Sequence, residues 1–251
     1  MPRILTNKTD LPLPIYYAIK NDTYEARGDI SITSLIDAPL PRILKKHKTY
    51  EEDASETIYA LLGSGVHSII ERMGKAQDQA QYIPEQKLMI DVPYMGRIIE
   101  VSGTTDLIER QYIMQGEGQY VETVNNKNII HDFKNTSVYN AMRGVEGNDK
   151  WVKQTNCYAA MTRATLGMDI HEIYIHAFLR DWSRNKAERN TNYPAYQVMT
   201  FKIPVYSQAS MLSYIKKRVE MHFDEEHNFV TGKDVLLCSD EDRWARPDIV
   251  K

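Results

Sequence analysis

Two apolar segments of this chain carry charged residues near their ends, and this feature limits the possible folds more than any other. The first segment, 101–108, carries Asp106, and the second, 129–134, carries Asp132 and ends in Lys134. Charged groups beside a protein core are costly unless they are paired or bind a ligand. Alternate residues of a strand point to opposite faces, so Asp132 and Lys134 share a face. If the two segments are neighbouring strands, both carboxylates meet at one edge of a sheet.

This pair of carboxylates has the ligand chemistry of a divalent cation site. Magnesium and manganese prefer oxygen ligands, and two carboxylates, a main-chain carbonyl and water molecules would satisfy them. Such a cation polarises a phosphoryl oxygen and makes a bound water more acidic. Lys134 would stabilise the developing negative charge or orient the attacking water. The alternative is an ordinary Asp–Lys ion pair at a strand end, because D-x-K alone is a weak pattern.

The composition predicts one domain and gives no sign of a strongly basic surface. The chain has 251 residues, 42% of them hydrophobic, which is enough for one sizeable core. Its net charge is −3, whereas nucleic-acid-binding proteins often have an excess of lysine and arginine. Any contact with DNA would therefore come from a local groove.

Cysteine usage and the lack of long apolar runs indicate an intracellular protein. Cys157 and Cys238 are far apart and form no CxxC pair, which argues against a zinc ribbon or a cluster held by four cysteines. The first residues contain no apolar run typical of a signal peptide, and no segment reaches the length of a membrane span. We therefore expect a cytoplasmic protein without a membrane partner.

Hydrophobic periodicity predicts an α/β fold. Helices are expected over 53–73, 148–166 and 207–223, and strands over 88–92, 97–109, 128–133, 172–179 and 196–203. This order favours a central mixed β-sheet flanked by α-helices. We expect an N-terminal arm over 1–30, the core over 31–205, and a C-terminal helix with an irregular tail over 206–251.

Three glycines and two prolines mark special places in the first half of the chain. Gly63, Gly65 and Gly74 fall in or at the end of the helix predicted over 53–73. A glycine inside a helix costs about 1 kcal/mol relative to alanine, so these positions predict close approach of another backbone or a ligand. The short helix after residue 31 is expected to stop at Pro39 and Pro41.

Two basic segments and one polar insertion are expected at the surface. Residues 42–48 are predicted to form a solvated helix face, with a phosphate-contacting rim as the alternative; their basic members are Arg42, Lys45, Lys46 and Lys48. The run 180–189 includes Trp182 and is predicted to be a solvated loop, although it could also contact a nucleic-acid strand through stacking and phosphates. The insertion 115–128 is predicted to be a long hairpin or loop.

In this context the sequence resembles the PD-(D/E)XK nucleases, and within them the RecB-like branch. The motif Gly103-Thr104-Thr105-Asp106, followed by Asp132-Phe133-Lys134, matches the acidic core of that family, with aspartate where glutamate is commoner at the second position. Residues 63–67 resemble its glycine-rich helix, which ends in a metal-binding histidine. Residues 154–158 match its Q-x-x-x-Y helix, and 31–39 match its N-terminal S-x-x-x-L…P segment. The matches stand in the family's order from residue 31 to residue 158.

The resemblance implies a role for each matched residue. The metal ligands would be His67, Asp106, Asp132 and the main-chain carbonyl of Phe133, with Mg²⁺ or Mn²⁺ as the cofactor. The catalytic groups would be Asp106, Asp132, Lys134 and, in a supporting role, Glu85, for which Glu100 and Glu109 are competitors. The DNA contacts would be Gln154, Tyr158 and Ser34.

Each of these assignments has an alternative in which the residue is structural. A lone histidine at position 67 is more often a packing residue. Gln154 and Tyr158 share a helix face and can be a polar pair at the edge of the core stripe. His131 points to the face opposite Asp132, so we do not expect it to be a ligand.

The resemblance implies a restriction-endonuclease-like core and a metal-dependent DNA nuclease. An exonuclease that acts on single strands or DNA ends in recombination, repair or replication is expected, similar to stand-alone phage or bacterial exonucleases. DNA would be its main partner, with a recombination or replication protein as a further candidate. Two alternatives stay open: a structure-specific endonuclease on the same fold, and a non-catalytic nuclease-like DNA-binding module.

Overall fold

The computed structural model describes residues 3–22, 27–77, 81–111, 113–114, 120–121, 127–239 and 242. Its chain divides into two compact units. The first unit comprises Met1–Thr57, Asp91–Ser102 and Ser213–Lys251, and the second comprises Ile58–Ile90 and Gly103–Leu212. Most of the insertion predicted at 115–128, and the tail beyond residue 242, lie outside the described residues. The predicted division into arm, core and C-terminal helix stays a prediction.

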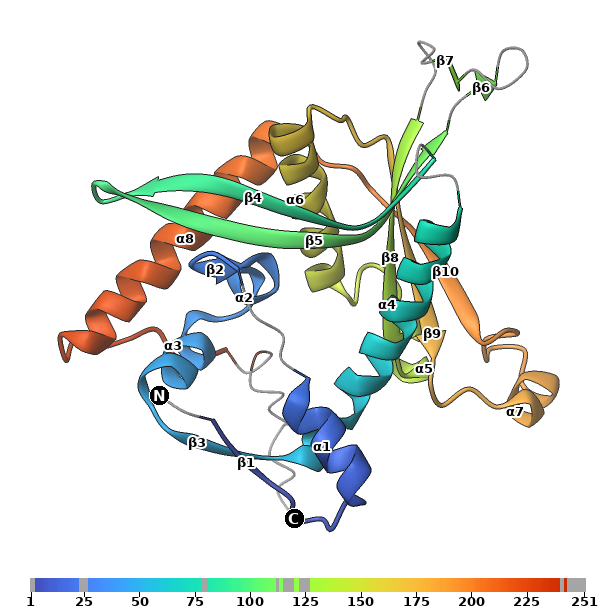
Figure 1. The fold of residues 1–251 in the computed structure, drawn as a ribbon, viewed down its shortest axis with the longest axis horizontal. Coiled ribbons are helices and arrows are strands. Elements are labelled where there is room, and N and C mark those ends of the chain that lie inside the picture. Colours follow the sequence, from blue (N-terminus) through green and yellow to red (C-terminus); the bar gives the residue numbers. More distant parts are fainter. Residues whose placement is uncertain are drawn as a thin grey trace. The chain divides into compact units, whose positions relative to one another are not determined.

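The second unit is built on a mixed β-sheet (Figure 1). Strand β8 (Lys127–Thr136) lies between β5 (Arg97–Gln111), which is antiparallel to it, and β9 (Glu172–Leu179), which is parallel to it. Strand β10 (Val198–Ile203) pairs with β9 in the antiparallel direction. The predicted α/β fold with a central mixed sheet and flanking helices is confirmed.

A hairpin joins β4 (Tyr82–Tyr94) to β5, and both strands run from one unit into the other. The two loop residues, Met95 and Gly96, have φ angles of 45° and 77°. Positive φ at both central residues is the geometry of a two-residue turn whose twist matches that of the flanking strands. This turn connects the segments that were predicted to be strands over 88–92 and 97–109.

Four helices accompany the sheet of the second unit: α4 (Ile58–Ala76), α5 (Val138–Met142), α6 (Asp149–Leu166) and α7 (Arg184–Arg189). Helix α6 ends at Gly167, which adopts the left-handed conformation that glycine tolerates best. Strand β9 alternates buried and half-buried residues along its length, as a strand with one core face should. Its fully buried members are Ile173, Ile175 and Ala177.

The run 180–189, predicted to be a solvated loop, is more ordered than expected because part of it joins the core. Residues 184–189 form α7, and Trp182 packs against a buried cluster that includes Val138 and Leu179. The Trp182 indole N–H donates to the Pro194 carbonyl at 2.8 Å. Trp182 is therefore a structural residue, while its basic neighbours Arg184 and Lys186 are exposed.

The glycines of α4 have two different surroundings. A Cβ added to Gly74 would lie 2.9 Å from the Pro84 Cβ, so the close neighbour there is a proline side chain and not the predicted backbone or ligand. A Cβ added to Gly63 or Gly65 would meet no described atom within 4 Å. These two positions therefore leave open space beside the helix.

The first unit contains more regular structure than the predicted arm. Its strands are β1 (Arg3–Thr6), β2 (Ile30–Ser31) and β3 (Tyr50–Asp53). Its helices are α1 (Leu13–Asn21), α2 (Ile32–Ile36), α3 (Pro39–His47) and most of α8 (Gln208–Val230). A 3₁₀ turn, η1 (Ala54–Thr57), follows β3. Strand β1 pairs in parallel with β3, and β2 pairs in parallel with β5 at Val101 and Ser102. Helix α8 extends seven residues beyond its predicted end at residue 223.

The prolines after α2 begin a helix as well as ending one. Pro39 occupies the first turn of α3, where its missing N–H would have no partner within the helix. The predicted stop after α2 is correct, but the chain resumes a helix at once. The expectation of a solvated face holds for Lys45, Lys46 and Lys48, which are exposed, whereas Arg42 is half-buried.

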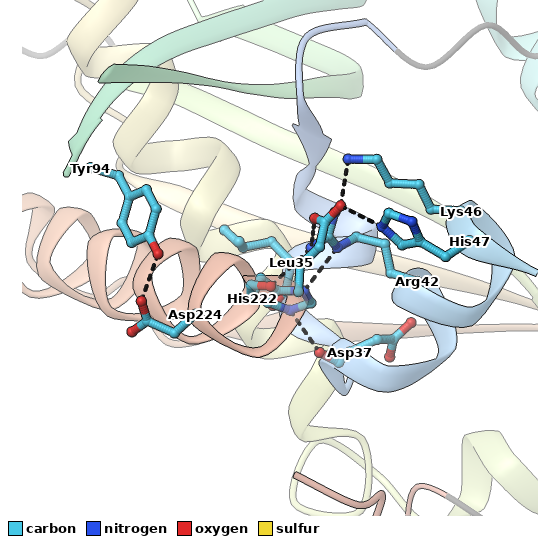
Figure 2. A network of polar contacts seen from close by, with 9 residues as sticks. Leu35, Asp37, Arg42, Lys46, His47, Tyr94, His222 and Asp224 are labelled. Atoms are coloured by element: carbon cyan, nitrogen blue, oxygen red, sulfur yellow. Dashed lines mark hydrogen bonds and ion pairs between the residues drawn. The ribbon is translucent and has the colours of Figure 1, made fainter. Parts of the chain in front are cut away.

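A network of polar contacts joins α2, α3 and α8 within the first unit (Figure 2). Arg218 and His222 on α8 donate to the carbonyls of Leu35 and Asp37, which lie at the end of α2. The last carbonyls of a helix lack partners within it, so these contacts complete α2. The Arg42 Nε donates to the His222 Nδ1 at 3.3 Å, which requires a neutral imidazole with its proton on Nε2.

Glu226 closes this network through contacts with an arginine, a lysine and a histidine of α3. Its carboxylate lies 2.8 Å from the Arg42 Nη2, 2.6 Å from the Lys46 Nζ and 2.9 Å from the His47 Nε2. Burial by itself raises the pKa of Glu226, but the hydrogen bonds from Lys46, His47 and Arg42 together lower it to about 2. The folded carboxylate therefore keeps its charge to a lower pH than a free glutamate does.

We predict that acid weakens the first unit through His222. Burial, together with Arg218 and Arg42, lowers the pKa of His222 to about 4, against about 6.5 in an unfolded chain. Between these pH values His222 binds a proton in the unfolded state but not in the folded state. The free energy of unfolding therefore falls as pH drops from about 6.5 to about 4. The loss attributable to this histidine amounts to at most about 3 kcal/mol.

Urea unfolding at a series of pH values measures this effect. The variant His222→Gln should lose stability less steeply between about pH 6.5 and 4, while His227→Gln, which alters an exposed histidine of the same helix, should match the wild type. Equal slopes for His222→Gln and the wild type would contradict the assignment.

No helix in the part of the chain that the structure describes is long and apolar enough to cross a membrane.

Candidate metal centre and catalytic site

Three side chains from three elements of the second unit converge on one point. His67 comes from α4, Glu85 from β4 and Asp106 from β5. The His67 Nδ1 lies 3.2 Å from the Asp106 Oδ1 and 3.7 Å from the Glu85 Oε1. One ligand atom from each residue lies within 4.8 Å of the others, so the three could hold one cation.

Glu85 reaches this point through an unusual backbone conformation. Its φ angle is +46°, in the left-handed region that residues other than glycine rarely adopt. Such a conformation costs about 1–3 kcal/mol and persists only where the surrounding structure enforces it, often at a functional site. The strained backbone thus indicates that the direction of the Glu85 side chain, toward His67, is important for the site.

A second group of side chains starts at Asp132 and runs toward α6. The register of β5 and β8 pairs Leu107 with His131, so its continuation places Asp106 beside Asp132. The Lys134 Nζ lies 3.0 Å from the Asp132 Oδ2 and donates to the Gln154 Oε1 at 2.9 Å. Lys134 is therefore held between an aspartate of its own strand and a glutamine of α6.

Tyr158 fixes the glutamine that contacts Lys134. The Gln154 Nε2 donates to the Tyr158 Oη at 2.8 Å, one helical turn further along α6. With its amide nitrogen engaged in this way, the glutamine presents its oxygen to the lysine. This agrees with the expectation that Tyr158 supports Gln154, whereas the expected contact of Gln154 with DNA stays a prediction.

The electrostatics of the two groups differ. Hydrogen bonds to Asp106 and Glu85 raise the pKa of His67 to about 10, even though burial opposes its charge. For Asp132, which is only 2% exposed, burial raises the pKa, and the charge of Lys134 offsets this only in part. Its Oδ2 makes no hydrogen bond to a described residue although the lysine is close.

These residues fit a divalent cation of the magnesium or manganese type. The donor set is one imidazole and two carboxylates, with a third carboxylate oxygen at Asp132 that lacks a hydrogen bond. Oxygen-rich sets with a single nitrogen suit these cations. A ligating imidazole must be neutral, so cation binding would displace the proton of His67 and would strengthen as pH rises.

We predict that Glu85 contributes to the raised pKa of His67. The variant Glu85→Asn removes the charge but keeps a side chain that tolerates the left-handed backbone. The pKa of His67 in the cation-free protein should fall below 10 and stay above 6.5, because Asp106 remains in contact. Titration of the His67 ring by NMR measures this, with Glu188→Asn as a control at an exposed position. An unchanged pKa would contradict the role of Glu85.

The structure places the predicted site residues unequally. His67 and Asp106 join the three-residue group, as does Glu85, which was predicted in a supporting role. Asp132 stands next to this group, in contact with Lys134. Phe133 was expected to offer its carbonyl, but its observed contact is a backbone N–H that donates to the Asp106 Oδ2 at 2.7 Å. That contact orients Asp106, and the expected role of the Phe133 carbonyl stays a prediction.

Three further residues have other surroundings. Ser34 belongs to the first unit, where Ser31 caps α2 and contacts its hydroxyl and N–H, so its role in DNA binding stays a prediction. His131 contacts Glu109 and His176 at 2.9 Å each and not the three-residue group, in line with the expectation that it is not a ligand. Glu109 is thereby engaged elsewhere, so Glu85 is the better candidate of the two for the supporting catalytic role.

Sequence reasoning missed the continuous chain from Asp132 through Lys134 and Gln154 to Tyr158. Its individual members were predicted, and the i, i+4 spacing of the last two indicates their contact. The bond between Lys134 and Gln154 crosses from a strand to a helix, and no spacing in the sequence reports such a contact.

Comparison with known proteins bears on the fold alone. The solved structure described as "Crystal structure of SSO0001" is similar to this chain, with a TM-score of 0.50 and 12% sequence identity over 82% of this chain and 84% of that chain. No family model matches the chain, and no curated protein matches it in sequence. The likeness agrees with the α/β architecture described above.

Proposed function

We propose that this chain is a divalent-cation-dependent DNA nuclease of the PD-(D/E)XK type, RecB-like branch, and that it acts as an exonuclease on single strands or DNA ends. The observation that carries the proposal is the convergence of His67, Glu85 and Asp106 beside the Asp132–Lys134 pair. These are the residues that the sequence resemblance marks, and they come from three strands and a helix. Mg²⁺ or Mn²⁺ would be the cofactor.

Each residue has a defined task in this proposal. His67, Asp106 and Asp132 would hold the cation, with Glu85 beside them. When bound, the cation would polarise the phosphoryl group and make a water molecule more acidic. Lys134 would donate to the phosphate or to the attacking water, because its ammonium is positioned by Gln154 and Asp132 and retains one N–H for a ligand.

Digestion of labelled DNA tests the proposal. Linear strands labelled at the 5′ or the 3′ end should release nucleotides in Mg²⁺ or Mn²⁺, and chelation by EDTA should stop the release. The variant Lys134→Ala should lose at least about a hundredfold of the rate, which is the size of effect typical for one group that stabilises developing charge. Lys202→Ala, which alters a mostly exposed lysine of the same sheet, is the matched control.

Closed circular single strands decide the mode of cleavage, since an exonuclease leaves them intact and an endonuclease cuts them. DNA binding without any cleavage in either cation would overturn the nuclease assignment in favour of a binding module. Full activity of Lys134→Ala would overturn the assigned catalytic lysine.

A further inference from the structure

An exposed tyrosine and an exposed arginine meet near the start of α4, apart from the catalytic residues. The Arg180 guanidinium carbon lies 4.0 Å from the centre of the Tyr59 ring. Tyr59 is 56% exposed although the guanidinium covers part of its ring, and Arg180 is also exposed. A guanidinium at this distance is attracted to the ring face, so the two side chains orient each other. We call Tyr59 and Arg180 the stacking pair.

The positive charge of Arg180 is not neutralised by any residue that the structure describes. Its side chain has one other contact, an N–H that donates to the Asn135 carbonyl at 3.5 Å. The neighbouring Asp181 is engaged elsewhere, because its carboxylate accepts from the Val138 N–H at 2.7 Å and so caps α5. A surface arginine that is ordered by a ring and lacks a carboxylate partner can accept a phosphate or a flat ring as its ligand.

The stacking pair and the candidate catalytic residues lie on or contact the same two elements, α4 and β8. Along α4, Tyr59, Gly63 and His67 follow each other at intervals of four residues, which places them on one side of the helix. Along β8, Asn135 directly follows Lys134, and the Arg180 N–H donates to the carbonyl of Thr136 at the strand's end. Figure 1 shows the start of α4 at the same end of the sheet as α5 and the end of β9.

Open space lies beside α4 at Gly63, which stands between Tyr59 and His67 along the helix. No described atom lies within 4 Å of a Cβ added at Gly63, so a ligand can approach the helix backbone there. Eight residues of helix from Tyr59 to His67 span about 12 Å. A stacked nucleic-acid strand advances about 3.4 Å per nucleotide, so about three or four nucleotides cover this distance.

We propose that the stacking pair binds a base of single-stranded DNA, about three or four nucleotides from the phosphate at the catalytic site. The base stacks on the outer face of the guanidinium, and the N–H groups of Arg180 donate to a backbone phosphate. Duplex DNA keeps its bases inside the helix and offers no free base face to this pair. The pair therefore favours single strands over duplexes. This inference rests on the proposed nuclease function for its substrate, but its test does not require cleavage.

Binding of a fluorescently labelled oligothymidylate, followed by anisotropy in EDTA, measures the contribution of the pair. Tyr59→Ala and Arg180→Ala should each weaken binding about tenfold, since stacking of a base on a side chain is worth about 1–3 kcal/mol. Tyr59→Phe should bind as the wild type, because the ring is retained. An oligonucleotide with abasic sites should show little difference between Tyr59→Ala and the wild type.

Matched controls and clear outcomes separate this inference from the proposed function. Tyr196→Ala and Arg184→Ala alter exposed residues outside the pair and should bind as the wild type. Unchanged affinity in both Tyr59→Ala and Arg180→Ala, or an equal loss with the abasic strand, would overturn the stacking pair while leaving cation-dependent cleavage intact. The expected loss of binding without any cleavage by the wild type would refute the nuclease and retain the pair.

Discussion

Asp132→Asn is expected to abolish cleavage and to make the protein more stable. The loss of rate should reach about a thousandfold, because the change removes a carboxylate oxygen from the proposed cation site and the charge that holds Lys134. Stability should rise because the pKa of Asp132 is raised in the folded protein, which means that folding favours the neutral form. Asparagine has nearly the same shape and is always neutral.

Thermal unfolding and the nuclease assay on one preparation check both halves of this expectation. Asp234→Asn changes an exposed aspartate and should leave the rate and the melting temperature as in the wild type. If Asp132→Asn is inactive and also less stable than the wild type, the Asp132–Lys134 pair is a structural ion pair. It is then not a functional site that is kept at a cost in protein stability.

Glu226→Gln is expected to cause the largest loss of stability in the first unit. The carboxylate is 9% exposed and balances Arg42, which is itself mostly buried, together with Lys46 and His47. Removal of one partner from a buried charged network leaves the other charges uncompensated, which costs about 3 kcal/mol. Urea unfolding at neutral pH measures this loss.

The partner Lys46 provides the contrast, because its side chain is 55% exposed. Lys46→Ala should cost less than about 1 kcal/mol, as exposed ion pairs do. The difference between wild type and Glu226→Gln should shrink as pH falls from about 4.5 toward 2, since the folded carboxylate takes up its proton only near the lower value. Equal effects of the two variants would contradict a buried network.

Much of the fold was predictable because hydrophobic periodicity reports which residues face the core. The strand β9 and the helix α6 were predicted to within one residue of their ends. In the first unit, β1 and α1 fall in the expected N-terminal arm, for which no strand or helix was predicted. Strand β1 is stable only through its pairing with β3, a contact across more than forty residues that local pattern does not encode.

The same division applies to the candidate site. Asp106, Asp132 and Lys134 could be predicted because strand alternation and antiparallel pairing place them together once the strands are known. The direction of Glu85 could not, because it depends on a strained backbone angle that glutamate does not favour on its own. The contact between Tyr59 and Arg180 likewise joins residues that no local spacing relates.

By itself the sequence determined the α/β class, the order of the strands and the acidic–lysine motif, since each depends on residues close together along the chain. Only the tertiary structure decided that Lys134 contacts both Asp132 and Gln154, and that His67, Glu85 and Asp106 converge so that they could hold a cation. It also decided that the Phe133 N–H donates to Asp106. Hydrogen bonds and ion pairs act over about 3 Å, so they depend on how distant segments pack and not on their separation in sequence.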